Sequence, residues 1–157
     1  MKQAAKPASK PADRAPRNRP IADYLAYLLT QADRQINQRL DIEFKAEGVP
    51  VEQWRILKLL AERNGRSMVD LAQAALLKHP TLTKTIDRMI SQALVYRRAD
   101  REDGRKVLIF ISERGKQVNE RLNRLANLHQ DEIVDSCGSR DAEELKRLLE
   151  GLIKRTA

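Results

Sequence analysis

The sequence predicts a mainly α-helical fold with one small β-hairpin. Apolar residues recur at helical spacing through most of the 157 residues. The spacing changes between Tyr96 and Ile111, where two short extended segments flank a polar turn at Asp103-Gly104. Two short amphipathic helices precede this hairpin. Helix, turn, helix and hairpin in this order predict a winged helix-turn-helix lobe flanked by longer helices.

The N-terminal segments are expected to be a disordered arm and a long helix. Residues 1–19 are rich in Ala, Pro, Lys and Arg and have little to bury, which predicts a disordered basic arm. Pro20 then opens an apolar stripe that continues to Phe44, so a helix of about 26 residues is expected within 20–47. A small lobe cannot cover so long a stripe, and we therefore expect a homodimer.

The segment 48–111 is expected to hold the winged lobe. Its first helix opens at Pro50 and stops near Asn64-Gly65, a strong C-terminal signal. Ser67, with Asp70 three residues later, is typical of a capping box and predicts a second helix from Met68 to Leu77.

The third helix of the lobe opens at Pro80 and is amphipathic. One face is expected to be buried and holds Leu82, Ile86, Met89 and Ala93. The opposite face is polar and holds Pro80, Thr81, Thr83, Lys84, Asp87, Arg88 and Ser91. Such a helix fits the major groove of DNA, where hydroxyl and ammonium groups meet base edges or phosphates.

Two further helices are expected in the segment 112–157. The first runs from Ser112 to about Cys137-Gly138, and Ser139 is expected to cap the second. Both carry apolar stripes. We expect these helices to complete the dimer interface formed with the first helix.

The net charge of +8 is concentrated in two segments. Residues 1–19 carry six Lys and Arg against one Asp, and residues 78–106 carry eight against four acidic residues. The excess positive charge therefore lies in the arm and in the helix and hairpin expected to contact DNA. With one Trp, three Tyr and two Phe, the chain is poorly suited to stacking the bases of single strands.

Enzymatic chemistry is not expected. The two histidines, His79 and His129, lie in different elements, so no metal cluster or catalytic triad follows from the spacing. We expect no cofactor, no metal and no membrane span. The single cysteine, Cys137, suits the reducing cytoplasm of a bacterial or archaeal cell, where the bound protein would associate with the nucleoid.

The hairpin resembles the wing of the multiple antibiotic resistance regulator (MarR) family. The matching residues are Asp100, Glu102, Asp103, Arg105 and the run Ile111-Ser112-Glu113-Arg114-Gly115. Upstream matches in family order are Gln53–Leu57, Leu71-Ala72, Thr81–Thr83, Asp87–Met89 and Leu94–Arg97, within a resemblance that covers Ile21–Lys154. Ala93 stands where the family usually has Gly, and Arg101 and Gly104 replace the usual Pro and Arg.

The resemblance implies a ligand-responsive, winged helix-turn-helix regulator of transcription, with repression as the usual outcome. The expected contacts with a DNA operator are Lys78, His79, Pro80, Thr81, Thr83, Lys84, Arg88, Arg97, Arg98, Asp100, Arg101, Arg105 and Lys106. Arg105 is the best candidate for the minor groove, where the focused potential favours a guanidinium. Asp100 or Asp103 would hold it in position. A symmetric dimer would read an imperfect palindrome of roughly 16 to 20 base pairs.

An effector pocket is expected where the first, second and fifth helices meet. Tyr24, Tyr27, Trp54 and Arg55 would supply aromatic surface and one cation there. These groups suit an anionic aromatic ligand such as a phenolic acid or its CoA thioester. The alternatives are an architectural DNA-binding protein without an effector, an adaptor that binds protein, and an oxidant sensor acting through Cys137.

Overall fold

The computed structural model describes residues 19–100 and 102–156, and these residues divide into two compact units between Gln35 and Ile36. The basic arm predicted over 1–19 lies outside the described residues except for Arg19, and so does Arg101. In the first unit a 3₁₀ turn, η1 (Ile21–Asp23), precedes the start of α1 (Leu25–Ala46). The prediction of one continuous helix from Pro20 is wrong at Tyr24. This residue is extended, and its carbonyl accepts from Tyr27 and Leu28 as the new helix begins.

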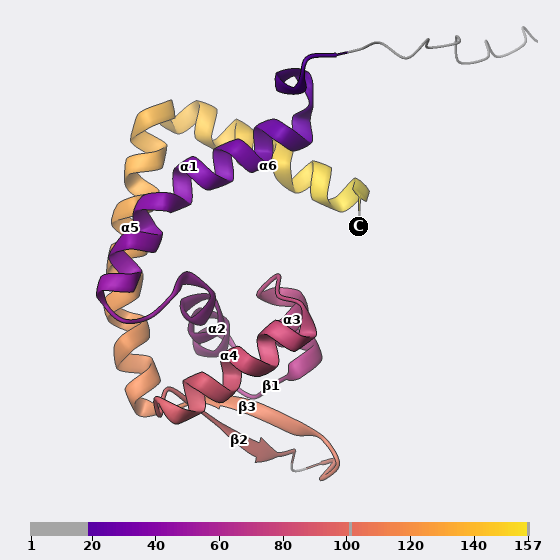
Figure 1. The fold of residues 1–157 in the computed structure, drawn as a ribbon, viewed down its shortest axis with the longest axis vertical. Helices are drawn as coiled ribbons and strands as arrows, with labels where there is room; N and C mark the ends of the chain where they lie inside the picture. Colours follow the sequence, from indigo (N-terminus) through magenta and orange to yellow (C-terminus); the bar gives the residue numbers. More distant parts are fainter. Residues whose placement is uncertain (1–18, 101, 157) are drawn as a thin grey trace, which may run out of the picture. The chain divides into compact units, whose positions relative to one another are not determined.

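The second unit contains a lobe of three helices and a small sheet (Figure 1). The helices are α2 (Val51–Glu62), α3 (Met68–Ala74) and α4 (His79–Ser91). The strands are β1 (Arg66–Ser67), β2 (Val95–Ala99) and β3 (Val107–Ile111), antiparallel in the order β1-β3-β2. This arrangement confirms the predicted winged helix-turn-helix. The extra strand β1 was not predicted, because a strand of two residues is too short to show the alternation of apolar and polar residues.

One hydrophobic core joins the elements of the lobe. Side chains with no exposed surface come from α2, α3, α4 and β3, and include Leu57, Leu60, Leu71, Leu82, Ile86, Met89 and Ile109. Phe44 at the end of α1 and Leu122 of α5 (Glu113–Cys137) extend the same core. Because α4 buries three large residues in this core, the orientation of its outer face relative to the other helices of the lobe is fixed.

The ends of α2 and α3 differ from the prediction by a few residues. The Ser67 hydroxyl accepts from the Asp70 N–H at 3.1 Å, which confirms the predicted cap of α3. However, α3 stops at Ala74 rather than Leu77, because Leu76 adopts a φ of +58°. The backbone N–H of Leu77 then bonds back to the carbonyl of Ala72, which completes the turn into α4.

Ala93 lies beyond the end of α4 and is exposed, so its predicted place on the buried face is wrong. Its φ is +55°, and its N–H bonds to Ile90 while that of Leu94 bonds to Met89. This is the helix-terminating turn in which glycine is preferred. Ala93 thus keeps the backbone expected of a glycine and carries the steric cost of its Cβ.

Replacing Ala93 with Gly should raise the free energy of unfolding by about 0.5–1 kcal/mol, because glycine adopts positive φ without that cost. Urea unfolding followed by circular dichroism measures the change. Gly65→Ala is the opposite control: at φ +76° the new Cβ would come within 2.8 Å of the Phe110 ring, so stability should fall. A loss of stability in Ala93→Gly would contradict the strain at this turn.

Two helices follow the lobe in the second unit. Ser112 caps α5, and α6 (Ser139–Thr156) turns back from its far end (Figure 1). Ser139 is the first residue of α6 rather than its cap, and Gly138 makes the turn with a φ of +84°. Among the described residues, no helix is long and apolar enough to cross a bilayer.

Candidate nucleic-acid interface

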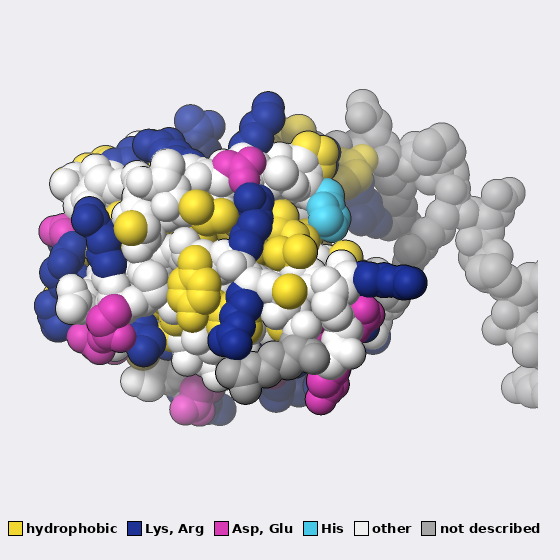
Figure 2. Space-filling model, turned by 90° about the horizontal axis from the view of Figure 1, so that it is seen from below, with side chains coloured by type: hydrophobic (Ala, Val, Ile, Leu, Met, Phe, Trp, Pro, Cys, Tyr) yellow, Lys and Arg dark blue, Asp and Glu magenta, His cyan; other side chains and the backbone are white. Residues whose placement is uncertain are grey.

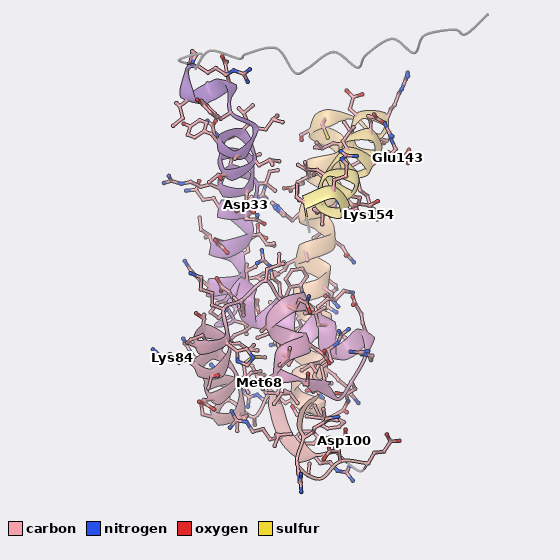
Figure 3. All side chains as sticks on the ribbon, turned by 90° about the vertical axis from the view of Figure 1, so that its right-hand side faces the viewer. Asp33, Met68, Lys84, Asp100, Glu143 and Lys154 are labelled. Atoms are coloured by element: carbon pink, nitrogen blue, oxygen red, sulfur yellow. The ribbon has the colours of Figure 1, made fainter. Side chains whose placement is uncertain are left out.

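The outer face of α4 carries the residues predicted to contact DNA. Leu82, Ile86 and Met89 anchor the helix in the core, so the intervening positions point away from the lobe. The predicted contact residues on and just before this helix are all exposed: Lys78, His79, Pro80, Thr81, Thr83, Lys84 and Arg88. Figure 3 shows Lys84 projecting outward from α4. In Figure 2 Lys and Arg side chains spread across the lower face between hydrophobic ones.

The cations on this face are uncompensated. Within residues 19–100 and 102–156, neither Lys84 nor Arg88 forms an ion pair. Thr83 donates its hydroxyl proton to the carbonyl of His79, so only its lone pairs remain for a partner. The helix therefore offers two free cations and hydroxyl acceptors in one row, a surface suited to phosphates and base edges.

Arg97, predicted as a DNA contact, is joined to α4 by an ion pair. Its Nη2 lies 2.7 Å from Oδ1 of Asp87 on α4, with both side chains about half exposed. The sequence analysis did not assign Asp87 a role, because the pairing depends on how the hairpin folds against the helix. This bond ties β2 to α4 and holds the wing and the helix in one orientation.

Asp87→Asn should lower operator affinity by roughly fivefold, because an exposed ion pair that holds the wing is worth up to about 1 kcal/mol. Electrostatics alone predicts the opposite, since removing a carboxylate near phosphates favours binding. The matched control is Glu102→Gln, another exposed acid of the wing that forms no ion pair in the described structure. Fluorescence anisotropy with labelled operator gives both affinities. An increase for Asp87→Asn would rule out a positioning role.

The wing tip is organised by its carboxylates, but they bind the backbone. Oδ1 of Asp100 accepts from the N–H of Glu102 at 3.0 Å, and Oδ1 of Asp103 accepts from the N–H of Arg105 at 3.2 Å. Asp103 also pairs with Lys106 at 3.5 Å. The expectation that one of them holds the Arg105 side chain is therefore corrected: a short Asp side chain reaches the backbone two residues ahead.

The Arg105 side chain is exposed and has no ion-pair partner among the described residues. Arg98 is likewise exposed and unpaired in that part of the chain, whereas Lys106 is shared with Asp103. Figure 3 shows Asp100 near the end of the wing, beyond the helices of the lobe. A guanidinium on a fixed backbone at this end can enter a narrow groove without breaking an existing contact.

The wing continues into α5 through a tight joint at Ser112 and Gly115. The Ser112 hydroxyl donates to the carbonyl of Ala93 at 2.7 Å and accepts from the N–H of Gly115 at 2.9 Å. A Cβ at Gly115 would lie 2.1 Å from the carbonyl oxygen of Leu94. The end of α4 and the start of α5 are thus held together by a contact that no other residue type fits.

The four predicted effector residues belong to different units. Tyr24 and Tyr27 are exposed in the first unit, and Trp54 and Arg55 are half-buried on α2 in the second. Trp54 packs edge-on against Phe44, with ring centroids 5.2 Å apart. Its indole N–H donates to Oδ1 of Asn123 on α5 at 2.9 Å. Trp54 thus has a structural role in joining α2 to α5. Nothing in the sequence pattern indicated Asn123 as its hydrogen-bond partner.

The described residues contain no group of three or more His, Cys, Asp and Glu that could hold a metal ion. Cys137 is exposed at the end of α5, and its thiol lies 3.2 Å from the carbonyl of Ile133.

Comparisons with known proteins agree with this geometry. The sequence pattern of the MarR family matches residues 47–106. The HTH-type transcriptional regulator FarR of Neisseria gonorrhoeae is 32% identical over 103 residues, which are 66% of this chain and 70% of FarR. The homoprotocatechuate degradative operon repressor of Escherichia coli is 28% identical over 131 residues, 83% of this chain and 88% of the repressor. The structure of NadR in complex with 4-hydroxyphenylacetate has a TM-score of 0.75 at 26% identity, covering 85% of this chain and 97% of NadR. This protein therefore belongs to the MarR family.

Proposed function

We propose that this protein is a transcriptional repressor that binds a palindromic operator as a homodimer and is released by a small anionic aromatic compound. The observation that carries the DNA-binding part is the exposed face of α4, where Lys84 and Arg88 are unpaired in the described structure. The Asp87–Arg97 bond sets the wing beside this face, so helix and hairpin can engage adjacent grooves.

The apolar faces outside the lobe support a dimer. In the second unit, a groove of about 820 Å³ between α5 and α6 is lined mainly by apolar residues, including Ile133, Val134, Leu145, Leu149 and Ile153. In the first unit, Ile21, Tyr24, Leu25 and Leu28 are exposed. Apolar surfaces of this extent on one chain are typical of an interface, and a second copy would present the same surfaces in a twofold arrangement.

The dimer and its operator can be tested together. Sequences selected from random duplex DNA, followed by footprinting, should give one imperfect palindrome of roughly 16 to 20 base pairs. Light scattering should give the mass of two chains, and Leu145→Glu with Leu149→Glu should yield monomers that lose the palindrome. Lys154→Ala, an exposed residue of the same helix outside this groove, is the control. Binding without sequence preference would instead identify an architectural protein.

The aromatic effector is supported by the names of two relatives and by residues of α2. NadR was solved with 4-hydroxyphenylacetate, and homoprotocatechuate is an aromatic acid. Arg55 forms no ion pair within the described ranges, so its guanidinium is free to meet a carboxylate beside Trp54. A ligand here would act by binding the DNA-incompetent arrangement more tightly than the competent one.

Trp54 provides the test, because it is the single tryptophan of the chain. Aromatic acids and their thioesters are screened by thermal shift, and a hit should change Trp54 fluorescence and release the operator at matching concentrations. Arg55→Ala should abolish the response without changing operator affinity. Lys58→Ala, one turn further along α2, is the matched control. If every ligand leaves operator affinity unchanged, the effector proposal fails while operator binding stands.

A further inference from the structure

A groove of about 460 Å³ lies between the first turn of α2 and one flank of α4. The residues of α4 that line the flank recur at helical spacing: Thr81, Lys84, Thr85 and Arg88. The other lining residues come from the start of α2 and from the chain entering α4: Pro50, Glu52, Gln53, Leu77 and Pro80. Because Pro80, Thr81, Lys84 and Arg88 are also predicted DNA contacts, the groove is continuous with the DNA face.

The charges around the groove favour an anion. Lys84 and Arg88 form no ion pair within residues 19–100 and 102–156. Glu52 is the one acid lining the groove, and it is exposed and likewise unpaired in the described ranges. Two cations against one carboxylate leave a net positive charge on this surface.

The first turn of α2 adds hydrogen-bond donors to this charge. Pro50 precedes the helix, and no side chain caps it. The N–H of Gln53 bonds to the carbonyl of Pro50 at 3.0 Å, whereas those of Val51 and Glu52 have no partner among the described residues. Open N–H groups and the helix dipole at such an end attract oxyanions.

A buried amide provides a second, independent indication of a ligand. Gln53 is only 2% exposed, and neither atom of its amide has a hydrogen-bond partner in the part of the chain that the structure describes. Its Oε1 is fully shielded from solvent, whereas the NH₂ is not, so the NH₂ is the donor available at the groove. A buried N–H without an acceptor costs free energy, which a bound oxyanion would recover.

We propose that this groove holds one phosphate of the DNA backbone in each half of the operator, so that α2 contacts DNA beside α4 and the wing. The phosphate would accept from the N–H of Glu52 and the NH₂ of Gln53, with Lys84 and Arg88 beside it. Its deoxyribose would lie on Pro50 and Pro80. Continuity with the DNA face selects a backbone phosphate over a free anion. The inference rests on the operator binding proposed above, but it can fail while that binding stands.

Glu52→Lys tests the site, with Glu62→Lys at the other end of α2 as the matched control. Removing the carboxylate and adding a cation should tighten operator binding by at least about tenfold, and more than the control does. Each operator phosphate is then replaced in turn by a neutral methylphosphonate, and affinities are measured by fluorescence anisotropy. The gain should disappear at one or two adjacent positions in each half-site and persist at the others. A gain equal to that of Glu62→Lys, or equal at every position, would overturn the proposal.

Gln53→Met separates loss of the contact from loss of the fold. It should raise the thermal midpoint, because it removes a buried unpaired amide, and weaken operator binding by about fivefold, because it removes a donor to phosphate. The loss should vanish at the same methylphosphonate positions. Unchanged operator affinity would exclude the contact. Displacement of the operator by millimolar inorganic phosphate at constant ionic strength would overturn the assignment to DNA and identify a free-anion site.

Discussion

Operator affinity is expected to fall on the order of 10⁴-fold when the salt concentration rises from 50 to 200 mM. Five of the cations predicted to contact DNA are exposed and unpaired within the described residues: Lys78, Lys84, Arg88, Arg98 and Arg105. Two copies of this set could neutralise about eight phosphates. Each phosphate contact contributes a slope of about −0.9 to log affinity against log salt, so a fourfold rise in salt costs about four decades.

Fluorescence anisotropy at several KCl concentrations measures this slope. Lys84→Ala should make it shallower by about two, because one phosphate contact is lost in each half of the dimer. The control is Arg147→Ala, whose side chain lies on α6 outside the proposed dimer groove and pairs with Glu144. A slope near zero for the unmodified protein would show that the exposed cations do not face DNA phosphates.

The helices of the lobe could be predicted where neighbouring residues alone determine them, through capping or helical spacing. Ser67 caps α3 through its own hydroxyl, and Leu82, Ile86 and Met89 are buried because helical spacing puts them on one face. The start of α1 and the end of α3 were less predictable. Tyr24 is extended and Leu76 has a positive φ, and neither residue type predicts that conformation. Ala93 has the positive φ that is usual for glycine at the end of a helix.

Contacts between distant segments could not be derived from spacing. The sequence places Asp87 and Arg97 on a helix and a strand, but their bond depends on the twist of the hairpin against α4. Trp54 and Asn123 are 69 positions apart, and their hydrogen bond depends on how α5 packs on α2. The exposure of the residues predicted to contact DNA therefore followed from the sequence pattern, whereas the bonds that orient their elements required the fold.

Arg105→Ala should weaken operator binding by about 10- to 100-fold, the largest loss expected from any single side chain. The backbone of Arg105 is fixed by Asp103, while its guanidinium is exposed and has no ion-pair partner among the described residues. Such a group can enter the minor groove without first breaking a bond in the free protein. The focused negative potential of a narrow groove then acts on a cation that is already in place.

Two comparisons separate groove insertion from simple charge. Arg105→Lys keeps the charge but has a more strongly hydrated head group, so it should recover only part of the lost affinity. Lys106→Ala removes an adjacent cation that Asp103 already compensates, and its effect should be smaller, about threefold. Replacing A·T by G·C pairs under the wing should weaken the unmodified protein but not Arg105→Ala, because A·T tracts narrow the minor groove. If Arg105→Ala and Lys106→Ala weaken binding equally at every operator, Arg105 contributes only its charge, and the wing does not read groove shape.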